Sequence, residues 1–582
     1  MIKNNLKVEV CKITFVQRIL LIVIYGFVVC SDVQAQDSTA IFTTEKFISP
    51  VDHTIKLAGS FGEIRTNHFH GGIDIKSRTG EEGDTIKASM SGFISRIKIQ
   101  SGGYGKVLYI THPNGYTTVY AHLQNFVDTV QQYINQKQIE SQSYEIDVYP
   151  GADKYKVRQG QAIGFMGNTG RSYGPHLHFE IRSSIEEIPQ NPYLFGIGPD
   201  DNKAPSLYNI DIHGLDNMQH KIWSKTQRTS TVKKGNLNVV NTIEVPAWRA
   251  GIAIQAIDLM NGAKNKNGVY AIQMFVDDTL YYSHIMNEVG FDVTKYINSH
   301  IDYQQKKKAK RTLIKCYKAL GNKLEFYPTL VNNGEIKLFK NKPRRVHIVL
   351  KDFYENTTEY SINLLRRDAK EGELQQFSFE KHLKFDSPAT FKLGSCQFDF
   401  PAFSLDKDGY ISYSENNSDG LLSFKINEEY DPLFNYPTVS LPLSGIPDSL
   451  LSKVILINEK DQSYGGQHRR DSLIVRFGVF GNYKISIDTI PPIIDVKSFL
   501  SKAKSKPFFR FEIRDNVEAK GFAKDIIYDV YIDGEWVIAP LKALDNTLIV
   551  PLHNIKSGNH HIKIRVEDHS HNVTIWERDF EN

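Results

Sequence analysis

The chain has 582 residues and a formal net charge of +4. At about 150 residues per domain, this length predicts three or four domains. A net charge this small argues against nucleic acid as the main partner, because nucleic-acid-binding domains carry a larger or more clustered basic charge. The 29 tyrosines and 33 phenylalanines far outnumber the 7 methionines, which favours strand-rich structure.

Residues 1–35 have the pattern of a secretory signal peptide. Basic residues precede the apolar run "ILLIVIYGFVVC" at 19–30, and "VQA" at 33–35 offers a small-residue cleavage site. The apolar run is shorter than the ~20 residues of a membrane-spanning helix. The sequence therefore predicts export, to the periplasm, the cell envelope or the medium, and an uncleaved N-terminal anchor is the alternative.

Cleavage after residue 35 would leave two cysteines in the mature chain. Cys316 and Cys396 lie far apart in the sequence. Two cysteines in an oxidising compartment form either one disulfide or none, and the spacing does not predict a bridge.

Residues 47–196 are rich in glycine and in alternating apolar residues. "GFISRIKI", "KVLYITH" and "TTVYAHL" are typical of short strands, and "SGGYG" and "HPNG" between them are turn signals. This pattern predicts an antiparallel all-β domain. Residues 128–158 interrupt it with a polar, glutamine-rich stretch, which predicts a long insertion or lid with a short helix.

Three more β-rich segments are expected after a linker at 191–205. They cover residues 205–368, 372–487 and 490–582. The first contains "QQKKKAKRTLIKCYKALG", a basic run that predicts a helical insertion with a solvated face rather than a nucleic-acid site.

The last segment is predicted to be an immunoglobulin-like β-sandwich. It begins after the Pro-Pro pair of "ISIDTIPPII", which cannot lie in a central strand, and continues as short strands separated by turns. "AIDLMNG" near Ala256 and "VEDHSHN" near Val566 both follow an alternating strand with an aspartate turn. These parallels suggest that the C-terminal modules share one architecture. The expected fold class is all-β throughout.

Two histidines alternate in "GPHLHFEI" at 174–181. Residues i and i+2 of a strand face the same side, so His176 and His178 should point into one cavity or onto one surface. Such a pair also occurs by chance, and by itself it is weak support for a functional site.

A second cluster is "NHFHGGIDI", where His70 lies four residues before Asp74. The Asp74 carboxylate interrupts an apolar run, and a buried carboxylate needs a cation. Two arrangements satisfy it: an ion pair with Arg65 or Lys76, or a metal ion bound jointly with His70.

A third piece is "VYAHL", in which His122 ends an apolar strand and Tyr120 is expected on the same side. Tyr120 is expected either to contact a ligand or to be a packed aromatic residue. A catalytic zinc takes three protein ligands and one water. Two further imidazoles beside the metal can take a proton from that water and stabilise the developing oxyanion. The histidines and the aspartate of the three pieces meet this need.

Taken together, "HGGID", "YAHL" and "TGRSYGPHLHFEIR" resemble the motifs of the lysostaphin-type (LytM-like) zinc metalloendopeptidases, which cut peptidoglycan cross-bridges. The resemblance covers roughly residues 50–190. It implies an antiparallel β-sheet peptidase domain, of the duplicated-hybrid-motif type, with an open groove over the metal. The insertion at 128–158 departs from the compact family pattern, so it is expected to narrow or cover that groove.

The resemblance also implies a role for each matching residue. One Zn²⁺ per chain would be bound by His70, Asp74 and His178, and His122 and His176 would be the catalytic histidines that do not bind the metal. Which of these two is the base is left open. His68 competes with His70 for the first position, but only His70 has the four-residue spacing to Asp74.

The function expected from this resemblance is that of an exported zinc endopeptidase acting on the peptide stems and cross-links of bacterial peptidoglycan. Two alternatives stand beside it: a non-catalytic regulator of other cell-wall hydrolases, and a zinc protease acting on proteins. The C-terminal β domains are expected to space the peptidase or to dock it to the wall or to a protein. The sequence specifies neither the scissile bond nor the oligomeric state.

Overall fold

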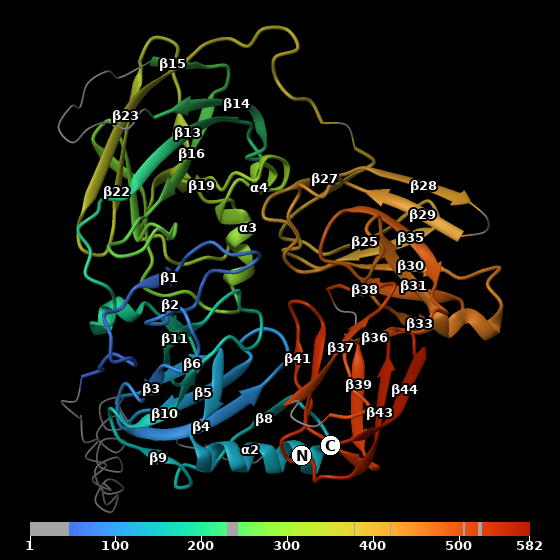
Figure 1. The fold of residues 1–582 in the computed structure, drawn as a ribbon. Helices are drawn as coiled ribbons and strands as arrows, with labels where there is room; N and C mark the ends of the chain where they lie inside the picture. The colour runs from blue at the N-terminus through green and yellow to red at the C-terminus, as the bar shows by residue number, and fades with distance from the viewer. Residues whose placement is uncertain (1–45, 230–241, 378, 419–420, 504–506, 522–525) are drawn as a thin grey trace, which may run out of the picture. The chain divides into compact units, whose positions relative to one another are not determined.

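The structure is a computed structural model that describes residues 46–582 apart from 230–241, 378, 419–420, 504–506 and 522–525 (Figure 1). The predicted signal peptide lies outside the described residues. Strands make up most of the regular structure and the helices are few and short, which confirms the all-β fold class. Among the described residues, no helix has both the length and the apolar character needed to cross a bilayer.

A large antiparallel sheet forms the body of the N-terminal domain. Its strands are β1 (Leu57–Gly59), β2 (Ile73–Lys76), β4 (Gly92–Ile99), β5 (Lys106–Thr111), β6 (Tyr116–Ala121), β8 (Ile146–Val148), β9 (Lys156–Val157), β11 (His176–Ser183) and β12 (Pro189–Gln190). They run in the order β1-β2-β11-β6-β5-β4-β8, with β12 beside β11 and β9 beside β4. A second sheet, β3-β10-β7, is made of β3 (Thr85–Lys87), β7 (Leu123–Phe126) and β10 (Ala162–Met166). The 3₁₀ helix η1 (Pro192–Phe195) follows β12.

The predicted insertion at 128–158 is more regular than the sequence suggested. It contains the 14-residue helix α2 (Asp128–Ser141), followed by β8 and β9. Val130, Ile134 and Gln138 lie four residues apart and form the buried stripe of this otherwise polar helix. Both β8 and β9 pair with β4, so the insertion extends the large sheet at the end away from β2 and β11.

Two sheets and several short helices make up the second domain. The strands are β13 (Ser206–Leu215), β14 (Lys221–Arg228), β15 (Thr242–Val245), β16 (Arg249–Ile257), β17 (Ala271–Val276), β18 (Thr279–Ile285), β19 (Ile314–Lys315), β20 (Thr329–Leu330), β21 (Ile336–Lys337), β22 (Arg344–Lys351) and β23 (Thr357–Arg366). One sheet has the order β14-β13-β16-β19 with β21 beside β16, and the other β15-β23-β22-β17-β18-β20. The helices are η2 (Thr294–Tyr296), α3 (Ile297–His300), α4 (Tyr303–Ala309) and η3 (Val331–Gly334).

The helical insertion expected in this domain is shorter than predicted. The basic run forms helix only over the seven residues of α4, which Asp302 caps by accepting a hydrogen bond from the backbone N–H of Gln305. The chain then enters strand β19, where Ile314 and Lys315 are buried. The apolar residues after the lysines therefore belong to a sheet and not to the helix.

The third and fourth β-rich parts follow. The third contains β24 (Lys381–Leu383), β25 (Ala389–Leu393), β26 (Cys396–Phe400), β27 (Gly409–Ile411), β28 (Tyr413–Ser418), β29 (Leu421–Ile426), β30 (Thr438–Pro442), η4 (Asp448–Lys453), β31 (Val454–Asn458), β32 (Gln462–Ser463), β33 (Gln467–Arg469), β34 (Ser472–Arg476) and β35 (Gly481–Ile487). The fourth contains β36 (Ile493–Ser498), β37 (Phe508–Arg514), β38 (Glu518–Ala519), β39 (Ile527–Ile532), β40 (Glu535–Trp536), β41 (Leu541–Lys542), β42 (Thr547–Pro551), β43 (Asn559–Glu567) and β44 (Val573–Glu581). The fourth part has two four-stranded sheets, β36-β37-β42-β41 and β40-β39-β43-β44.

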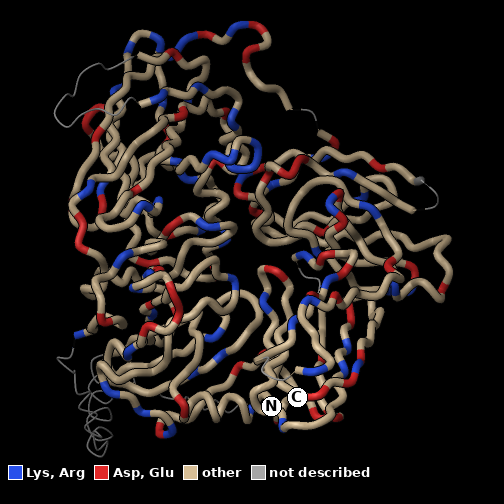
Figure 2. Tube along the Cα trace, viewed as in Figure 1, with Lys and Arg blue, Asp and Glu red and all other residues tan. Residues whose placement is uncertain are grey.

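The cores do not follow the predicted domain boundaries everywhere. Buried apolar residues of the N-terminal domain and of the second domain belong to one continuous cluster, which includes Phe69, Ile254 and Tyr282. The third and fourth parts each have a core cluster of their own. Cys316 and Cys396 are buried and free, so they form no disulfide. Basic and acidic residues are interspersed along the described chain (Figure 2).

Candidate metal centre

The pairing of β2 with β11 brings the predicted site residues together. In this antiparallel pair His178 lies directly opposite Asp74, and His176 lies opposite Lys76. Gly72, just before β2, allows the close approach, because a Cβ there would lie 2.3 Å from the carbonyl oxygen of Phe179. Side chains of directly opposed residues on one face of a sheet are neighbours, so the strand register itself places Asp74 beside His178.

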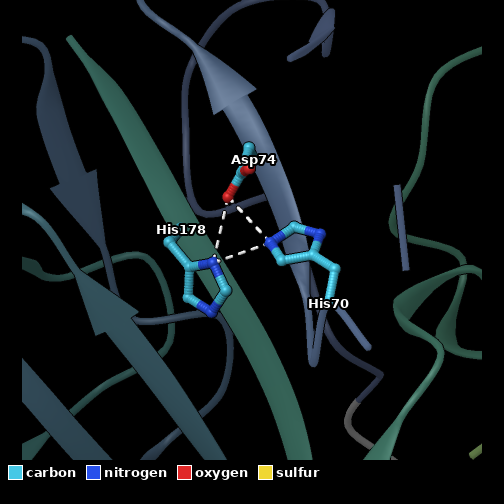
Figure 3. A group of neighbouring side chains, drawn as sticks. All are labelled: His70, Asp74 and His178. Carbon is cyan, nitrogen blue, oxygen red and sulfur yellow. Dashed lines mark hydrogen bonds and ion pairs between the residues drawn. The ribbon is translucent and has the colours of Figure 1, made fainter. Parts of the chain in front are cut away.

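Three ligand-type atoms converge at this point, as Figure 3 shows. Asp74 Oδ1 lies 3.0 Å from His70 Nε2 and 2.9 Å from His178 Nδ1, and the two nitrogens are 3.0 Å apart. All three residues are buried, with 4 to 7% of their surface exposed. Neighbouring ligands of a tetrahedral zinc, at 2.0–2.1 Å from the ion, lie about 3.3 Å apart, so this spacing is close to that of a zinc site.

The outer nitrogens of both rings have acceptors that fix which nitrogen faces the centre. His70 Nδ1 donates to the carbonyl oxygen of Ser60 at 2.7 Å, which leaves a lone pair on Nε2. His178 Nε2 donates to Glu180 Oε1 at 2.7 Å, which leaves a lone pair on Nδ1. Two nitrogen lone pairs and a carboxylate oxygen therefore face one another, an arrangement that a cation satisfies. A His₂Asp donor set fits zinc.

The electrostatics of the centre agree with cation binding. Burial raises the pKa of Asp74, but His70 and His178 outweigh it and hold this pKa well below its usual value. Burial lowers the pKa of His178, but hydrogen bonds to Asp74 and Glu180 raise it to about 9. Asp74 therefore stays a carboxylate, and a proton on His178 Nδ1 would compete with a metal ion for the same position, so metal binding should release it.

The second oxygen of Asp74 has its own partner. Arg65 donates to Asp74 Oδ2 at 2.9 Å and lies 3.3 Å from Glu63. The ion pair and the ligand cluster, which the sequence presented as alternatives, therefore coexist on one carboxylate. Gly59 leaves room for both, because a Cβ there would lie 2.2 Å from the Arg65 guanidinium and 2.7 Å from Asp74 Oδ2.

A buried polar network that the sequence analysis missed orients His178. Glu180 is fully buried, and Tyr104 and Arg182 both donate to it at 2.5 Å. Burial raises the pKa of Glu180, but Arg182 and His178 outweigh it and keep the carboxylate charged. Glu180 is two residues after His178 in the same strand, so it shares its face; this alternation was the signal that could have identified it.

The two further histidines lie beside the cluster. The ring of His122 is 4.7 Å from that of His176 and 6.0 Å from that of His178. His122 Nδ1 donates to the carbonyl oxygen of Thr169 at 2.8 Å, and His176 Nδ1 donates to that of Gly174 at 2.8 Å. His176 Nε2 lies 3.6 Å from Asp74 Oδ1. The Nε2 atom of each ring is therefore the proton acceptor.

Burial keeps both of these rings neutral. It lowers the pKa of His122 to about 3, with contributions from His176 and His178, and it lowers the pKa of His176 although Asp74 opposes the shift. His122 has a positive φ of 61°, so the chain leaves β6 at Ala121 and turns the imidazole toward the cluster. Such a conformation is uncommon for a residue other than glycine.

Two other residues singled out in the sequence lie outside the centre. His68 is exposed and its Nδ1 contacts the carbonyl oxygen of Thr66, so it is not part of the ligand cluster. Tyr120 is fully buried in the core, and its hydroxyl bonds the backbone N–H of Ser89 and the hydroxyl of Thr118. Of the two expectations for Tyr120, the packed aromatic is the one observed.

The second domain holds the loop that carries His70. The backbone N–H of Phe69 donates to the hydroxyl of Thr294 at 2.8 Å, and the Phe69 ring packs edge-on against Phe326. Asn298 donates to the side-chain oxygen of Asn67 at 3.0 Å. Local sequence patterns do not predict these contacts, because the paired residues are more than 200 positions apart.

The model of "Peptidase family M23" matches residues 68–145 and 147–192, which contain all five histidine and aspartate residues of this centre. Residues 68–192 of the chain are thus similar to peptidase family M23. This agrees with the LytM-like resemblance of the motifs. A second family model, that of a "Zu5-like domain", matches residues 380–488.

Curated relatives match about a quarter of the chain. The DD-carboxypeptidase/endopeptidase Mpg of Neisseria meningitidis serogroup B is 36% identical over 150 residues, which are 25% of this chain and 28% of that protein. The peptidoglycan DD-endopeptidase ShyC of Vibrio cholerae is 30% identical over 149 residues, again 25% of this chain and 28% of that protein. The chain thus covers little more than a quarter of the length of either relative.

A solved structure also matches this part of the chain. The catalytic domain of the antimicrobial peptidase lysostaphin from Staphylococcus simulans aligns with 24% identity and a TM-score of 0.18. The match covers 24% of this chain and 91% of that domain.

Proposed function

We propose that this protein is an exported zinc metalloendopeptidase that hydrolyses peptide cross-links of bacterial peptidoglycan. The observation that carries the proposal is the convergence of His70 Nε2, Asp74 Oδ1 and His178 Nδ1 within 3.0 Å of one another. The Ser60 carbonyl and the Glu180 carboxylate take up the outer ring protons, so the inner atoms are left to bind a cation.

Zinc held by these three residues would lower the pKa of a bound water to about 7 and polarise the scissile carbonyl. His122 and His176 serve as the proton-transfer groups. Both are neutral and present Nε2. One ring would accept the proton of the attacking water at Nε2 and, as imidazolium, return that proton to the leaving amine; the other would stabilise the developing oxyanion only once its own Nε2 carries a proton. Their side-by-side placement leaves open which of the two is the base.

The substrate follows from the relatives and not from the geometry. Two curated relatives bear names for DD-endopeptidase activity, one of them on peptidoglycan. Their match covers 25% of this chain, so the assignment of peptidoglycan peptide stems as substrate is an inference. Export through the signal peptide predicted at 1–35 would bring the enzyme to that substrate in the periplasm or the cell envelope.

The test is hydrolysis of a defined cross-linked muropeptide, with the products identified by mass spectrometry. The zinc-loaded chain should cleave the cross-link and a chelator should abolish the cleavage. His178→Ala should lose both zinc and hydrolysis, whereas the control His68→Ala should keep both, because His68 lies outside the cluster.

Two outcomes would overturn the proposal. If His178→Ala retained full zinc occupancy and turnover, the assignment of the metal centre would be wrong. If the protein bound one zinc but cleaved no muropeptide, a regulatory role toward other hydrolases would replace it. Cleavage of unrelated proteins at a comparable rate would favour the general zinc protease.

A further inference from the structure

Two clusters of three aspartates lie outside the M23 centre. In each cluster one oxygen from each side chain lies within 4.8 Å of the others. The members of the first are Asp201, Asp258 and Asp352, and those of the second are Asp488, Asp515 and Asp568. An acidic cluster alone does not make a binding site. The hydrogen bonds, burial and surroundings of these aspartates are therefore compared below.

The third aspartate of each cluster begins a hairpin turn in which it makes the same three hydrogen bonds to an asparagine four residues later. Asp352 follows β22 directly, and the backbone N–H and side-chain amide of Asn356 donate to its two carboxylate oxygens at 2.8 and 2.7 Å. Asp568 follows β43 directly, and Asn572 makes the same two bonds to it at 2.8 and 2.9 Å. The backbone N–H of each aspartate also donates to the carbonyl oxygen of its asparagine, at 3.2 Å from Asp352 to Asn356 and at 3.1 Å from Asp568 to Asn572.

The first aspartates correspond as well. Asp201 and Asp488 each lie four residues before a proline in the linker that precedes a β-sandwich. Each carbonyl oxygen accepts a bond from the asparagine of the hairpin, at 3.4 Å for Asp201 and 3.2 Å for Asp488. Each carboxylate accepts from the backbone N–H two residues later, at 3.4 and 3.3 Å.

The second aspartates complete the parallel. Asp258 is the residue immediately after β16, and Asp515 is the residue immediately after β37. Two parts of one chain therefore build the same three-aspartate arrangement at the same end of the sandwich, although their other residues differ. This repetition would be unexpected if the clusters were accidental.

Each cluster keeps buried carboxylate oxygens that have no hydrogen-bond partner. Asp258 is 1% exposed and its Oδ1 has none, and neither does Oδ2 of Asp201. Asp488 is 3% exposed and its Oδ2 has none. The half-buried Asp515 is approached by the backbone N–H groups of Asn516 and Val517, but neither of its oxygens makes a hydrogen bond of good geometry. Burying an unpaired carboxylate is costly, so these oxygens need a cation to balance their charge.

No protein cation fills that role. Within the described part of the chain, none of the six aspartates takes part in an ion pair. The nearby Lys203 donates to the carbonyl oxygen of Met260 at 3.1 Å, and Lys453 donates to the carbonyl of Ser570 at 2.7 Å. Burial and the neighbouring carboxylates raise the pKa of Asp258 to about 7 and that of Asp515 to about 6. Burial and the repulsion between the carboxylates therefore both disfavour a cluster of three ionised aspartates without a cation.

The first cluster also faces a small cavity. Its volume is about 10 Å³, and Asp201, Asp258 and Asp352 are part of its lining, together with Tyr193 and Tyr354. A volume of about 10–15 Å³ holds one water-sized particle. The space is therefore suited to a single ion and not to an organic ligand.

We propose that each cluster binds one calcium ion, and that the ion ties the linker before the sandwich to the strand ends of that sandwich. Three carboxylates form a hard, all-oxygen donor set, which is the kind that calcium takes. Ligands at about 2.3–2.6 Å from one ion lie at most about 5 Å apart, and the observed oxygens meet that limit. Magnesium demands a tighter octahedron and retains water, so it fits less well.

Calcium titration of the full-length mature chain tests this inference. The zinc-loaded protein is dialysed into calcium-free buffer and titrated with CaCl₂ alone, and bound calcium is counted. The wild type is expected to bind two calcium ions per chain. Each single variant, Asp258→Asn or Asp515→Asn, should bind one, and the double variant should bind none. Asp200→Asn and Asp545→Asn remove the same charge at exposed positions near the two clusters and should keep both ions.

Thermal unfolding distinguishes a cluster that binds a cation from one that only stabilises the fold through its hydrogen bonds. In calcium-free buffer, Asp258→Asn and Asp515→Asn should melt at or above the wild-type temperature, because each removes carboxylate repulsion. In calcium, only the wild type and the two controls should gain the full stabilisation. A lower melting temperature of both variants in both buffers would overturn the proposal, and so would an equal shift with MgCl₂.

The outcome is independent of the proposed peptidase function. Zinc content and muropeptide hydrolysis of Asp515→Asn should equal those of the wild type, since its cluster shares no residue with the M23 centre. A chain that bound no calcium but hydrolysed muropeptide would overturn only the calcium proposal. A chain that bound two calcium ions without hydrolysis would overturn only the peptidase proposal.

Discussion

Glu180 accepts the outer ring proton of His178 at 2.7 Å, and Tyr104 and Arg182 hold the same carboxylate in place. This carboxylate–histidine pair turns His178 Nδ1 toward Asp74 and increases its basicity. Partners of this kind typically contribute a factor of about 10–100 to metal affinity.

Glu180→Gln should therefore weaken zinc binding about 10–100-fold, because glutamine keeps the shape of the side chain but loses the charge. The zinc dissociation constant, measured by competition with a chelating indicator over a range of pH, checks this. Arg182 loses its buried partner, so unfolding should be followed in parallel. Glu186→Gln at an exposed position on the following turn is the control. Equal zinc affinities in the two variants would contradict the role given to Glu180.

His122→Ala should retain zinc but lower kcat about 10²–10⁴-fold, the usual contribution of a general acid or base. His122 does not belong to the ligand cluster, and its Nδ1 is held by the carbonyl of Thr169. Zinc content by elemental analysis and kcat on a muropeptide are measured on the same sample. Loss of zinc in this variant would show that His122 belongs to the metal centre and not to the proton-transfer pair.

The sequence predicted the local part of this site and missed the part built from distant contacts. Alternation in a strand predicted that His176 and His178 share a face. The resemblance to the LytM-like motifs grouped His178 with Asp74, and the pairing of β11 with β2 puts these two residues opposite each other. The same alternation failed to predict the position of Tyr120 relative to His122. Strand β6 ends at Ala121, and the positive φ of His122 turns its side chain away from the face of Tyr120.

The missed residues fall into two kinds. Glu180 is local: the alternation in the strand puts it on the face of His178, but a glutamate in a strand is usually solvated, and its burial depends on Arg182 and on the distant Tyr104. The contact of Phe69 with Thr294 joins two domains across 225 positions. Single-sequence patterns report local periodicity, and they contain no information on such a pairing.

Thr294→Val should weaken zinc binding by loosening the loop that carries His70. The substitution keeps the shape of the side chain but leaves the Phe69 N–H without its acceptor, which costs about 1–3 kcal/mol for a buried group. Zinc affinity and unfolding free energy are the measurements, with Thr279→Val at an exposed position of β18 as the control. If zinc affinity were unchanged while stability fell, the second domain would support the fold without positioning the ligand loop.

Acid should destabilise the second domain through its buried histidines. His284 and His300 are 1% exposed, their rings lie 5.2 Å apart, and neither Nε2 has a hydrogen-bond partner. Burial lowers the pKa of His284 to about 3, and burial together with His284 holds the pKa of His300 well below its usual value.

The sign of the effect follows from proton uptake. Below pH ~6.5 the unfolded chain protonates these histidines while the folded chain does not, so the free energy of unfolding falls with decreasing pH, from about 6.5 down to about 3. Each group contributes about 1.4 kcal/mol per pH unit in that window. Denaturant unfolding at pH 7.5 and 5.5 should therefore show a smaller pH-dependent loss for His284→Phe than for the wild type. His553→Phe at an exposed position should leave the loss unchanged, and an unchanged loss in His284→Phe would contradict the assignment.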